Sequence, residues 1–374
     1  MANQTVTLKQ IAQQAGVSIT TVHRVLNNKE GCGEELKQKI LEIAKREGYT
    51  CNVAASSMSK HTMHVALVFP KHDRTSRFFL QPMLDGYLNN RPEFAKFNLL
   101  FQEYYYANVE SDAVPGEITP LTCLRQIYLE QPVRFDGLVM YDIDPSQGVK
   151  DMINRLIGRG LPVVMMERAP AGIDGVCCVS PDERAAGRLA AELIAKMLRS
   201  CRAGTVAVLQ QALSIGDSNS RAFVEELQGR FGKQAPDMKI CCLSCSLSGE
   251  ISRQVREKLE KIPDLVAIYA TSARHTAAYL EIRADLPAAP DIAVGSELFE
   301  ESYEALQTGA LDAVIDKRPY TIGHRALEHA FDSVVRGVPL PAERRIVPRI
   351  LLQGNADAYY KGEKERYDID SQIE

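Results

Sequence analysis

The sequence predicts an α/β protein with an all-α N-terminal part of three short helices, followed by a two-lobed domain built on parallel sheets. Two patterns predict it. In the first fifty residues, apolar side chains recur at helical spacing in short runs. From His64 onward, apolar runs alternate with amphipathic segments, as in βαβ units. A chain of 374 residues exceeds one ordinary core, so two or three domains are expected.

Composition and charge fit a folded protein with an unevenly charged surface. Hydrophobic residues make up 45% of the chain, and the net charge is -4. Residues 1–60 hold eight Lys/Arg against five Asp/Glu, which leaves +3 there and -7 elsewhere. A basic beginning indicates an anionic partner, although so small an excess is weak support by itself.

We expect a cytoplasmic protein. The nine cysteines come without the charged-then-apolar pattern of a secretory leader, which favours a reducing compartment. No apolar run approaches the roughly 18 residues that a membrane span needs. No membrane partner is therefore expected.

The first two predicted helices are separated by a tight turn. After Thr7, the run LKQIAQQA places apolar residues at helical spacing, and Gly16 allows a sharp turn. Ser18 is suited to cap the next helix, ITTVHRVLN, whose Val22, Val25 and Leu26 form one apolar face. Two such helices form a helix-turn-helix.

A third helix follows Gly33 and completes a minimal core. Its inner stripe contains Leu36, Ile40, Ile43 and Ala44, and two glutamates stand at its positive dipole end. In this geometry the second helix lies in the major groove of DNA. Its outer residues are then candidates for DNA contact, and Arg24 is the first choice for reading a guanine. Simple solvation of a surface helix is an equally good interpretation of the segment taken alone.

The N-terminal runs VTLKQIAQQAGVSITTVHRVLN and EGYTCNVAASSMSK resemble the headpiece and hinge of LacI/GalR regulators, whose pattern is TLxDVAxxAGVSxxTVSRVLN followed by GYxPNxxAxxL. The resemblance implies that Ile19, Thr20 and Arg24 face bases, with His23 beside them. It implies backbone contacts from Ser18, Thr21 and Asn27, and a hinge helix from Asn52 to about Lys60 that aims Ala55 and Met58 at the minor groove. Thr7 completes the DNA-binding set.

Three positions depart from the family pattern. His23 replaces the usual Ser, which leaves the operator sequence open. Cys51 replaces the usual Pro and loosens the entry to the hinge. Met58 stands where the family has a Leu that wedges between base pairs, a role that an apolar, flexible side chain can still perform.

Ten strands are predicted beyond the hinge. They are HVALVF at 64, FNLLFQ at 97, GLVMY at 137, PVVMM at 162, TVAVLQ at 205, KICCL at 239, LVAIYA at 265, DIAVGS at 291, LDAVID at 311 and RRIVPRILL at 344. Helices separate nearly all of them. One helix is predicted to begin with Ser180 as N-cap, Pro181 in the first turn and Glu183 as the capping-box partner.

So many βα units exceed one sheet of normal width, which predicts two lobes. The expected boundaries are a headpiece at 1–50, a hinge at 51–63, an effector-binding domain at 64–353 and a charged tail at 354–374. Lobe 1 is expected at about 64–168 and 318–343, and lobe 2 at about 169–317 and 344–353. This domain also resembles the family's effector domain, which is similar to periplasmic sugar-binding proteins.

Ligands in open α/β sheets bind beyond the carboxyl ends of the strands. The candidates there are His72, Asp142, Asp144, Glu167, Thr271, Glu297 and Lys317. Their carboxylate and other polar groups suit a polyhydroxylated ligand. For each one taken singly, a solvated loop residue or helix cap is the commoner role.

The family resemblance sharpens part of this set. It implies a ligand-binding acid at Glu297, places Lys317 where a Gln is common, and leaves either Asn219 or Arg221 in the position of a family Arg. Thr271-Ser272 replaces the usual Asn-Asp pair, so the ligand need not be a familiar one. Since the chain has no Trp, Phe78 and Phe79 are the candidates for stacking on a sugar ring, with a core or rim role equally open.

Two other pairs of residues are not expected to bind a metal. Cys242 and Cys245 form a CxxC without a second pair or a His at zinc-ligand spacing. His324 and His329 are five residues apart, a step of about 140° that keeps them from sharing one ion on a helix. No metal and no cofactor is expected.

The sequence therefore predicts a homodimeric transcriptional regulator, expected to be a repressor, which binds an operator in double-stranded DNA. A small-molecule effector, a sugar or sugar derivative, would control its affinity for DNA. The absence of GxSxG, phosphate-loop and dinucleotide motifs argues against an enzyme. The alternatives are a sugar sensor that does not bind DNA and an enzyme acting on a sugar-like ligand. The sequence leaves open the effector, the operator, the regulated genes and the sign of regulation.

Overall fold

The computed structural model describes residues 8–26, 33–47, 62–71, 77–107, 118–130, 135–141, 146–201, 203–211, 218–231, 235, 237–246, 250–287 and 289–360. Its contacts divide the chain into two compact units, Met1–His61 and Thr62–Glu374.

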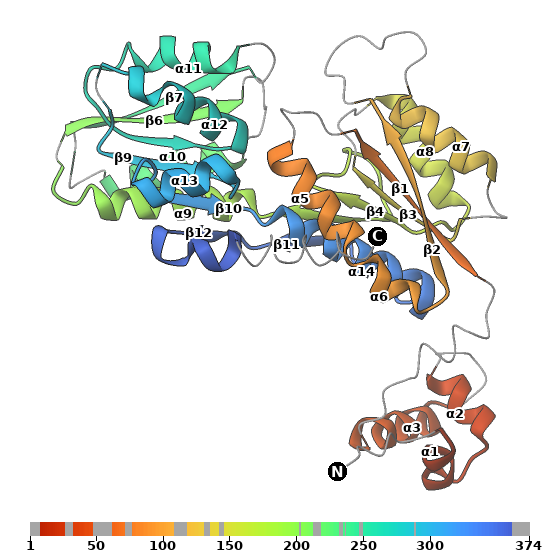
Figure 1. Ribbon diagram of the computed structural model, residues 1–374. Coiled ribbons are helices and arrows are strands. Elements are labelled where there is room, and N and C mark those ends of the chain that lie inside the picture. Colours follow the sequence, from red (N-terminus) through yellow and green to blue (C-terminus); the bar gives the residue numbers. More distant parts are fainter. Residues whose placement is uncertain are drawn as a thin grey trace. The chain divides into compact units, whose positions relative to one another are not determined.

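The described part of the first unit contains three short helices around a small core (Figure 1). They are α1 (Leu8–Ala15), α2 (Ile19–Leu26) and α3 (Glu34–Arg46). The predicted apolar stripes meet in the middle, where Ile11, Val22 and Ile40 are fully buried. Gly16 takes φ +73° between α1 and α2, a left-handed conformation that glycine adopts without steric cost. The predicted trihelical fold is therefore present.

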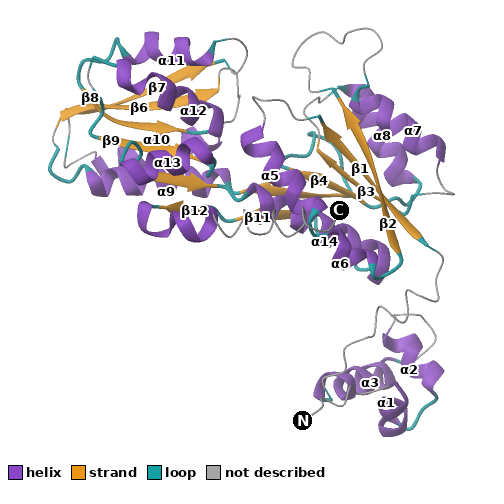
Figure 2. Ribbon diagram, viewed as in Figure 1, coloured by secondary structure: helices purple, strands orange, loops and turns teal. Residues whose placement is uncertain are grey.

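The second unit contains two six-stranded sheets with helices on both faces (Figure 2). The first sheet has the order β11-β5-β4-β3-β1-β2, and every pairing in it is parallel. Its strands are β1 (Met63–Pro70), β2 (Leu99–Tyr106), β3 (Gly137–Tyr141), β4 (Val163–Met166), β5 (Val176–Pro181) and β11 (Glu343–Ile346).

The second sheet has the order β12-β10-β9-β8-β6-β7, parallel except for the β10–β12 pair. Its strands are β6 (Ala203–Gln211), β7 (Asp237–Cys245), β8 (Leu265–Ala270), β9 (Ile292–Ser296), β10 (Ala313–Asp316) and β12 (Arg349–Leu351). The central strands read as nearly continuous apolar runs because both of their faces are covered.

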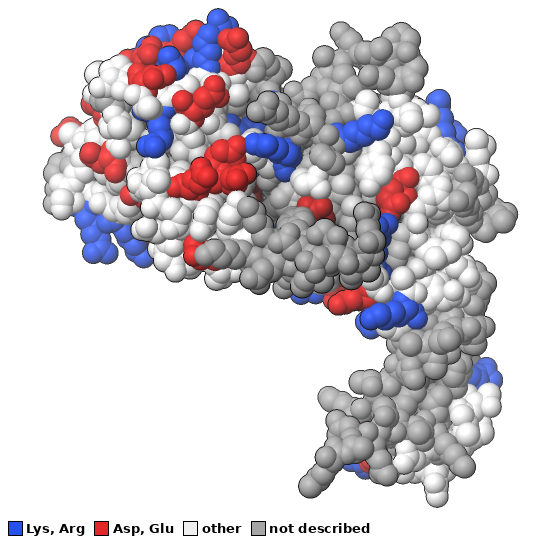
Figure 3. Space-filling view, viewed as in Figure 1, with Lys and Arg blue, Asp and Glu red and all other residues white. Residues whose placement is uncertain are grey.

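Helices cover the two faces of each sheet. The first lobe has α5 (Arg77–Leu88), α6 (Arg91–Ala95), α7 (Pro120–Glu130), α8 (Gln147–Gly158) and α14 (Pro319–Arg336). The second has α9 (Glu183–Met197), α10 (Ser218–Phe231), α11 (Ile251–Leu259), α12 (Ala273–Ile282), the 3₁₀ turn η1 (Arg283–Asp285), α13 (Glu300–Thr308) and a last helix at 353–360. On the face seen in Figure 3, acidic and basic side chains alternate over α11, where Arg253 and Arg256 pair with carboxylates.

The second lobe has a separate core on each face of its sheet. One contains Ile268, Tyr279 and Leu306 under α11, α12 and α13. The other contains Phe223, Tyr269 and Ile194 under α9 and α10. Glycine brings α9 and α10 together, because a Cβ at Gly187 would lie 2.1 Å from the carbonyl oxygen of Asn219. The close packing at Gly187 thereby holds the start of α9 against Asn219 on α10.

The chain passes between the two sheets three times, and two of the expected lobe boundaries are wrong. Strand β5 belongs to the first sheet, so the chain leaves lobe 1 after residue 181 and not near 168. Strand β11 also pairs in the first sheet, so the last passage falls after Ile346. The predicted strand at 344 is in fact two strands, since Pro348 lies between β11 and β12 and lacks an N–H for a ladder. The remaining passage leads from β10 to α14 of the first lobe.

The predicted start of the helix near residue 180 is also wrong. Ser180 and Pro181 end β5, and Asp182 is the N-cap, with its carboxylate accepting from Ala185 N at 2.9 Å. The sequence VCCVSP forms a strand that the sequence analysis missed, because Ser-Pro just before an apolar helix imitates a helix start. The shift puts Glu183 in the first turn of α9.

Among the described helices, none combines the length and the apolar character that crossing a membrane requires.

Candidate functional site

The outer side of α2 carries the predicted DNA-contacting residues of the first unit. Ser18 caps the helix, accepting from Thr21 N at 3.1 Å, and its hydroxyl lies 2.9 Å from that of Thr21. Ile19, Thr20 and Arg24 are exposed, and Ile19 shows 48% of its surface. Because Val22 and Val25 occupy the core, the exposed residues share the opposite side of the helix.

The remaining predicted DNA contacts cannot be placed. Thr7, Asn27, Asn52, Ala55 and Met58 lie outside the described residues, as does Cys51. His23 lies on α2, but its side chain is outside the description.

In the second unit, three predicted residues meet at the carboxyl ends of neighbouring strands. Thr271 follows β8, Glu297 follows β9 and Lys317 follows β10. Lys317 Nζ donates to the Thr271 carbonyl at 3.3 Å and lies 3.6 Å from Glu297 Oε1. All three are buried, so the sheet places a polar cluster in a desolvated setting.

Two further residues complete what we call the Lys317 cluster. Lys317 Nζ donates to Glu183 Oε1 at 3.1 Å, and Asn219 Nδ2 donates to the other oxygen of Glu183 at 2.7 Å. Asn219 in turn accepts from the Tyr269 hydroxyl at 2.9 Å. Both the nitrogen and the oxygen of the Asn219 amide therefore take part in hydrogen bonds within the protein. The cluster comprises Glu183, Asn219, Thr271, Glu297 and Lys317.

Glu297 is held in an unusual state by its surroundings. Its backbone has φ +66°, a left-handed conformation that costs energy for a non-glycine residue, and its side chain is 1% exposed. Oε2 accepts from Lys317 N at 3.1 Å, whereas Oε1 has no hydrogen-bond partner among the described residues. The ammonium 3.6 Å away attracts Oε1 without hydrogen-bonding to it. Burial raises the pKa of Glu297 to about 8, against the opposing effect of Lys317.

At Lys317, neighbouring charges affect the pKa more than burial does. Burial lowers its pKa, but the carboxylates of Glu183 and Glu297 outweigh burial and raise the pKa above its ordinary value. Next to it, Asp316 is paired with Arg349 at 2.6 Å and also accepts from Arg318 N at 2.9 Å. The ammonium is thus fixed in its charged form within the cluster.

Glu167 has the same place in the first lobe that Glu297 has in the second. Each follows the carboxyl end of a central parallel strand, and Glu167 also has a left-handed backbone, with φ +70°. Glu167 Oε2 is a buried atom without a hydrogen-bond partner in the part of the chain that the structure describes. Burial raises the pKa of Tyr141 well above its usual value, and the nearby Glu167 carboxylate raises it further.

The two phenylalanines that begin α5 reach toward the second lobe. The ring centroid of Phe79 lies 5.8 Å from Lys317 Nζ, and Phe78 packs on Phe299 with centroids 4.4 Å apart. Beside them, Arg77 pairs with Glu301 at 2.7 Å. Both phenylalanines are half-buried. We call the junction of the two lobes, where these rings approach the Lys317 cluster and Phe299, the cleft.

The other predicted ligand contacts are not assembled there. Asp142, Asp144 and His72 lie outside the described residues. Arg221 is exposed on α10, two residues beyond Asn219, and no described contact joins it to the cluster. Glu183, Asp316 and Arg349 were missed by sequence reasoning. Glu183 begins the helix after β5, and Asp316 ends β10. Their positions at strand ends could have identified them, but the position of Glu183 is hidden when β5 itself is missed.

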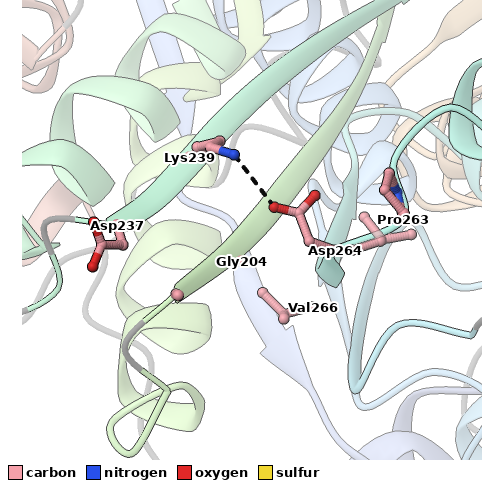
Figure 4. Close-up of a pocket in the computed structure, with 8 residues that line it drawn as sticks. Gly204, Asp237, Lys239, Pro263, Asp264 and Val266 are labelled. Atoms are coloured by element: carbon pink, nitrogen blue, oxygen red, sulfur yellow. Dashed lines mark ion pairs between the residues drawn. The ribbon is translucent and has the colours of Figure 1, made fainter.

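One hollow lies at the opposite, amino-terminal edge of the second sheet. It has a volume of about 630 Å³ and is lined by Gly204, Asp237, Lys239, Asp264 and neighbouring residues. Figure 4 shows Lys239 and Asp264 facing each other across it, and their charged atoms are 3.5 Å apart. Thr205 also donates to Asp264 at 2.9 Å. Since these charges satisfy each other, this hollow is a weaker ligand site than the cleft. The described part of the chain holds no group of three residues able to bind a metal.

These observations define a class: a small helical unit with an exposed second helix, joined to a two-lobed α/β binding domain. The family described as "Periplasmic binding protein domain" matches residues 126–335, and "Bacterial regulatory proteins, lacI family" matches residues 7–52. The first match covers more than half of the chain. The chain belongs to the periplasmic binding protein domain family, and it carries a LacI-family helix-turn-helix domain at its N-terminal end.

Named relatives agree with this assignment. The probable HTH-type transcriptional repressor ExuR of Bacillus subtilis is 31% identical over 168 residues, which span 44% of this chain and 43% of the relative. The HTH-type transcriptional regulator GntR of Pseudomonas aeruginosa is 28% identical over 187 residues, 50% of this chain and 49% of the relative. The chain thus matches about half of the length of these relatives.

A solved structure shares the fold of the second unit. The arabinose binding protein AraP from Geobacillus stearothermophilus aligns with a TM-score of 0.62 and 20% identity, covering 80% of this chain and 100% of that one. At this identity, the likeness supports the two-lobed fold alone.

Proposed function

We propose that the protein is a DNA-binding transcriptional regulator, acting as a repressor, whose affinity for an operator is controlled by a sugar or sugar derivative bound in the cleft. The observation that carries the proposal is the union of two parts in one chain. An exposed helix-turn-helix face belongs to a LacI-family domain, and a buried polar cluster lies at the strand ends of a periplasmic-binding-protein domain. Relatives named as transcriptional regulators, and not as enzymes, support a non-catalytic role.

The proposed DNA contacts follow from the first unit. Thr20 and Arg24 would meet base edges from the exposed side of α2, with Ile19 beside them, while Ser18 and Thr21 would approach the phosphates. One such unit reads only half of a palindromic site. The proposal therefore includes a homodimer, which works in the cytoplasm where the chromosome is.

The proposed effector contacts follow from the second unit. Glu297 Oε1 and Glu167 Oε2 are buried oxygens without hydrogen-bond partners among the described residues, and a sugar hydroxyl can hydrogen-bond to such atoms. Phe78 and Phe79 offer apolar faces on the other wall. That a similar fold is named for arabinose binding supports a sugar-sized ligand.

Control of DNA binding would come from closure of the lobes. Three chain passages join the lobes, and the contacts of Phe78 with Phe299 and of Arg77 with Glu301 are made only while the lobes lie together. A ligand that touches both walls binds the closed form better. It can therefore shift the population of two states that differ in operator affinity.

The decisive experiment measures binding to DNA without knowledge of the operator. Purified protein is selected against a pool of random duplexes, and the enriched sequence is titrated at several salt concentrations. We expect a palindromic site whose affinity falls steeply with salt, because phosphate contacts release counterions. The matched control is residues 62–374, which keeps the second compact unit and lacks the helices. Equal binding by the control, or no binding by the full chain, contradicts the proposal.

A further inference from the structure

The passage from β10 to α14 is short, and its backbone has a costly conformation. It consists of Lys317 and Arg318, which stand between the end of the strand and the start of the helix. Arg318 has φ +61°, a left-handed conformation that costs energy for a residue with a Cβ. Its N–H donates to Asp316 Oδ1 at 2.9 Å, which is the bond of an Asx turn. The shape of the passage therefore depends on the carboxylate of Asp316.

The carboxylate of Asp316 is in turn held by Arg349. The two residues face each other in the antiparallel pair of β10 and β12, and Arg349 Nε donates to Asp316 Oδ2 at 2.6 Å. The Asp316 side chain is only 5% exposed, so its charge needs a partner in this desolvated place. Because one carboxylate oxygen binds Arg349 and the other binds Arg318, the guanidinium sets the position of the passage.

The last described helix, residues 353–360, covers the guanidinium of Arg349. The Cζ atom of this arginine lies 3.7 Å from the centroid of the Tyr359 ring, which is a cation–π contact. The helix lies beside β12, the strand that carries Arg349 (Figure 1). A line of contacts therefore runs from Tyr359 through Arg349 and Asp316 to the passage between the lobes.

This helix buries little apolar surface against the second lobe. Of its residues, only Ala356 is fully buried. Tyr360 stacks on Tyr303 of α13 with ring centroids 4.1 Å apart, and Asp357 accepts from the Tyr303 hydroxyl at 2.7 Å. An element with few buried apolar contacts opens locally more readily than the core of the same domain. The helix is thus suited to detach while the sheet beneath it stays folded.

We propose that the helix at 353–360 is a detachable brace for the passage between the lobes. When docked, it holds Arg349, Asp316 and the left-handed turn at Arg318 in the observed arrangement. Lys317 lies within this turn, so the docked brace also keeps its ammonium in the Lys317 cluster. When detached, it releases the passage, and the lobes become free to change their angle. The inference goes beyond the proposed function, because it concerns the passage itself, with or without DNA.

Hydrogen exchange of the full-length protein tests the brace, with single amides resolved by mass spectrometry. Tyr359→Leu keeps an apolar side chain and removes the ring face over the guanidinium. We expect the amides of Lys317 and Arg318 to exchange about five times faster, the factor that corresponds to one contact of this kind. The matched control is Tyr128→Leu, which removes the same kind of contact from Arg159 in the first lobe and should leave both amides unchanged.

A second variant detaches the helix without touching the tyrosine. Ala356→Arg forces a long charged side chain into the buried side of the helix and should accelerate exchange in the passage at least as much. Ala358→Arg adds the same side chain on the exposed side and should not. In an Arg349→Gln background, Tyr359→Leu should add less than about twofold, because the line of contacts is already broken.

Three results would overturn the inference. The first is unchanged exchange in the passage with either Tyr359→Leu or Ala356→Arg. The second is equal acceleration in the central strands β8 and β9, which would mean a general loss of stability. The third is a full additional effect of Tyr359→Leu in the Arg349→Gln background. DNA plays no part in this measurement, so failure of the brace leaves the proposed function standing, and failure to bind any duplex leaves the brace standing.

Discussion

Lys317 and Glu183 are 134 residues apart in the chain, and their charged atoms lie 3.1 Å apart. Lys317 directly follows β10, where the chain leaves the second sheet, and Glu183 begins the helix that follows β5. The pair therefore fastens two of the segments that run between the lobes. Glu297 lies near the same ammonium, so both the stability of this region and the charge at the cleft depend on the Lys317 side chain.

Replacing Lys317 with Met should destabilise the protein by roughly 3–5 kcal/mol, the usual cost of removing one partner from a buried ion pair. Glu183 and Glu297 would keep their positions without a cation. Urea unfolding measures the free energy of unfolding. The control is Lys196→Met, which removes an exposed partner of Glu192 and should cost at most about 1 kcal/mol. Equal losses in the two variants would show that Lys317 is not a buried anchor.

The pH dependence of stability should reveal Glu297. Burial raises its pKa from 4.5 to about 8 in the folded chain, so the folded state binds this proton more tightly than the unfolded state. The resulting stability is complete below pH 4.5 and is lost as the pH rises toward 8. The free energy of unfolding of the wild type should fall over this window relative to Glu297→Gln. Other titrating groups, such as His329, occur in both proteins and cancel in the difference.

Parallel curves for the wild type and Glu297→Gln between pH 4.5 and 8 would contradict this prediction. They would mean that the carboxyl group is ionised throughout. Lys317 would then hold Glu297 in its charged form against the effect of burial.

Sequence reasoning located the helices of the first unit because their apolar stripes and the turn at Gly16 are local signals. It placed Thr271, Glu297 and Lys317 at strand ends for the same reason. It could not see that Asn219 is bound on both sides by Glu183 and Tyr269, because that contact joins distant segments. It also missed β5, where Ser180 and Pro181 imitate a helix start while pairing with β11 keeps the chain extended. Long-range pairing decided the outcome there.

Arg24→Ala should reduce binding to the selected duplex by a factor of about 10 to 100, which corresponds to 1–3 kcal/mol for a lost base contact. Binding to an unrelated duplex should fall much less. Lys37→Ala on α3 removes the same charge and serves as the control. Gel-shift titrations at one salt concentration give both affinities. Equal losses on the two duplexes would assign Arg24 to the phosphates.

Gly187→Ala should destabilise the second unit by about 1–3 kcal/mol, since its Cβ would press against the backbone of Asn219 and force α9 away from α10. The shift would also disturb the Asn219–Glu183 contact. Gly229→Ala is the control on α10, where nothing lies within 4 Å of the added carbon. There, alanine should stabilise the helix by up to about 1 kcal/mol. Thermal unfolding of both variants measures whether the two changes in stability have opposite signs.

The three passages between the sheets set the order in which a nascent chain can finish folding. The first sheet receives its last strand, β11, only at residues 343–346, and α14, which covers it, ends at Arg336. Until residue 346 has left the ribosome, β5 keeps an unpaired edge, and until α14 is complete the sheet keeps an uncovered apolar face; both promote association with other chains. A premature stop before residue 343 therefore yields no half-working lobe, but a product prone to aggregate and to be degraded.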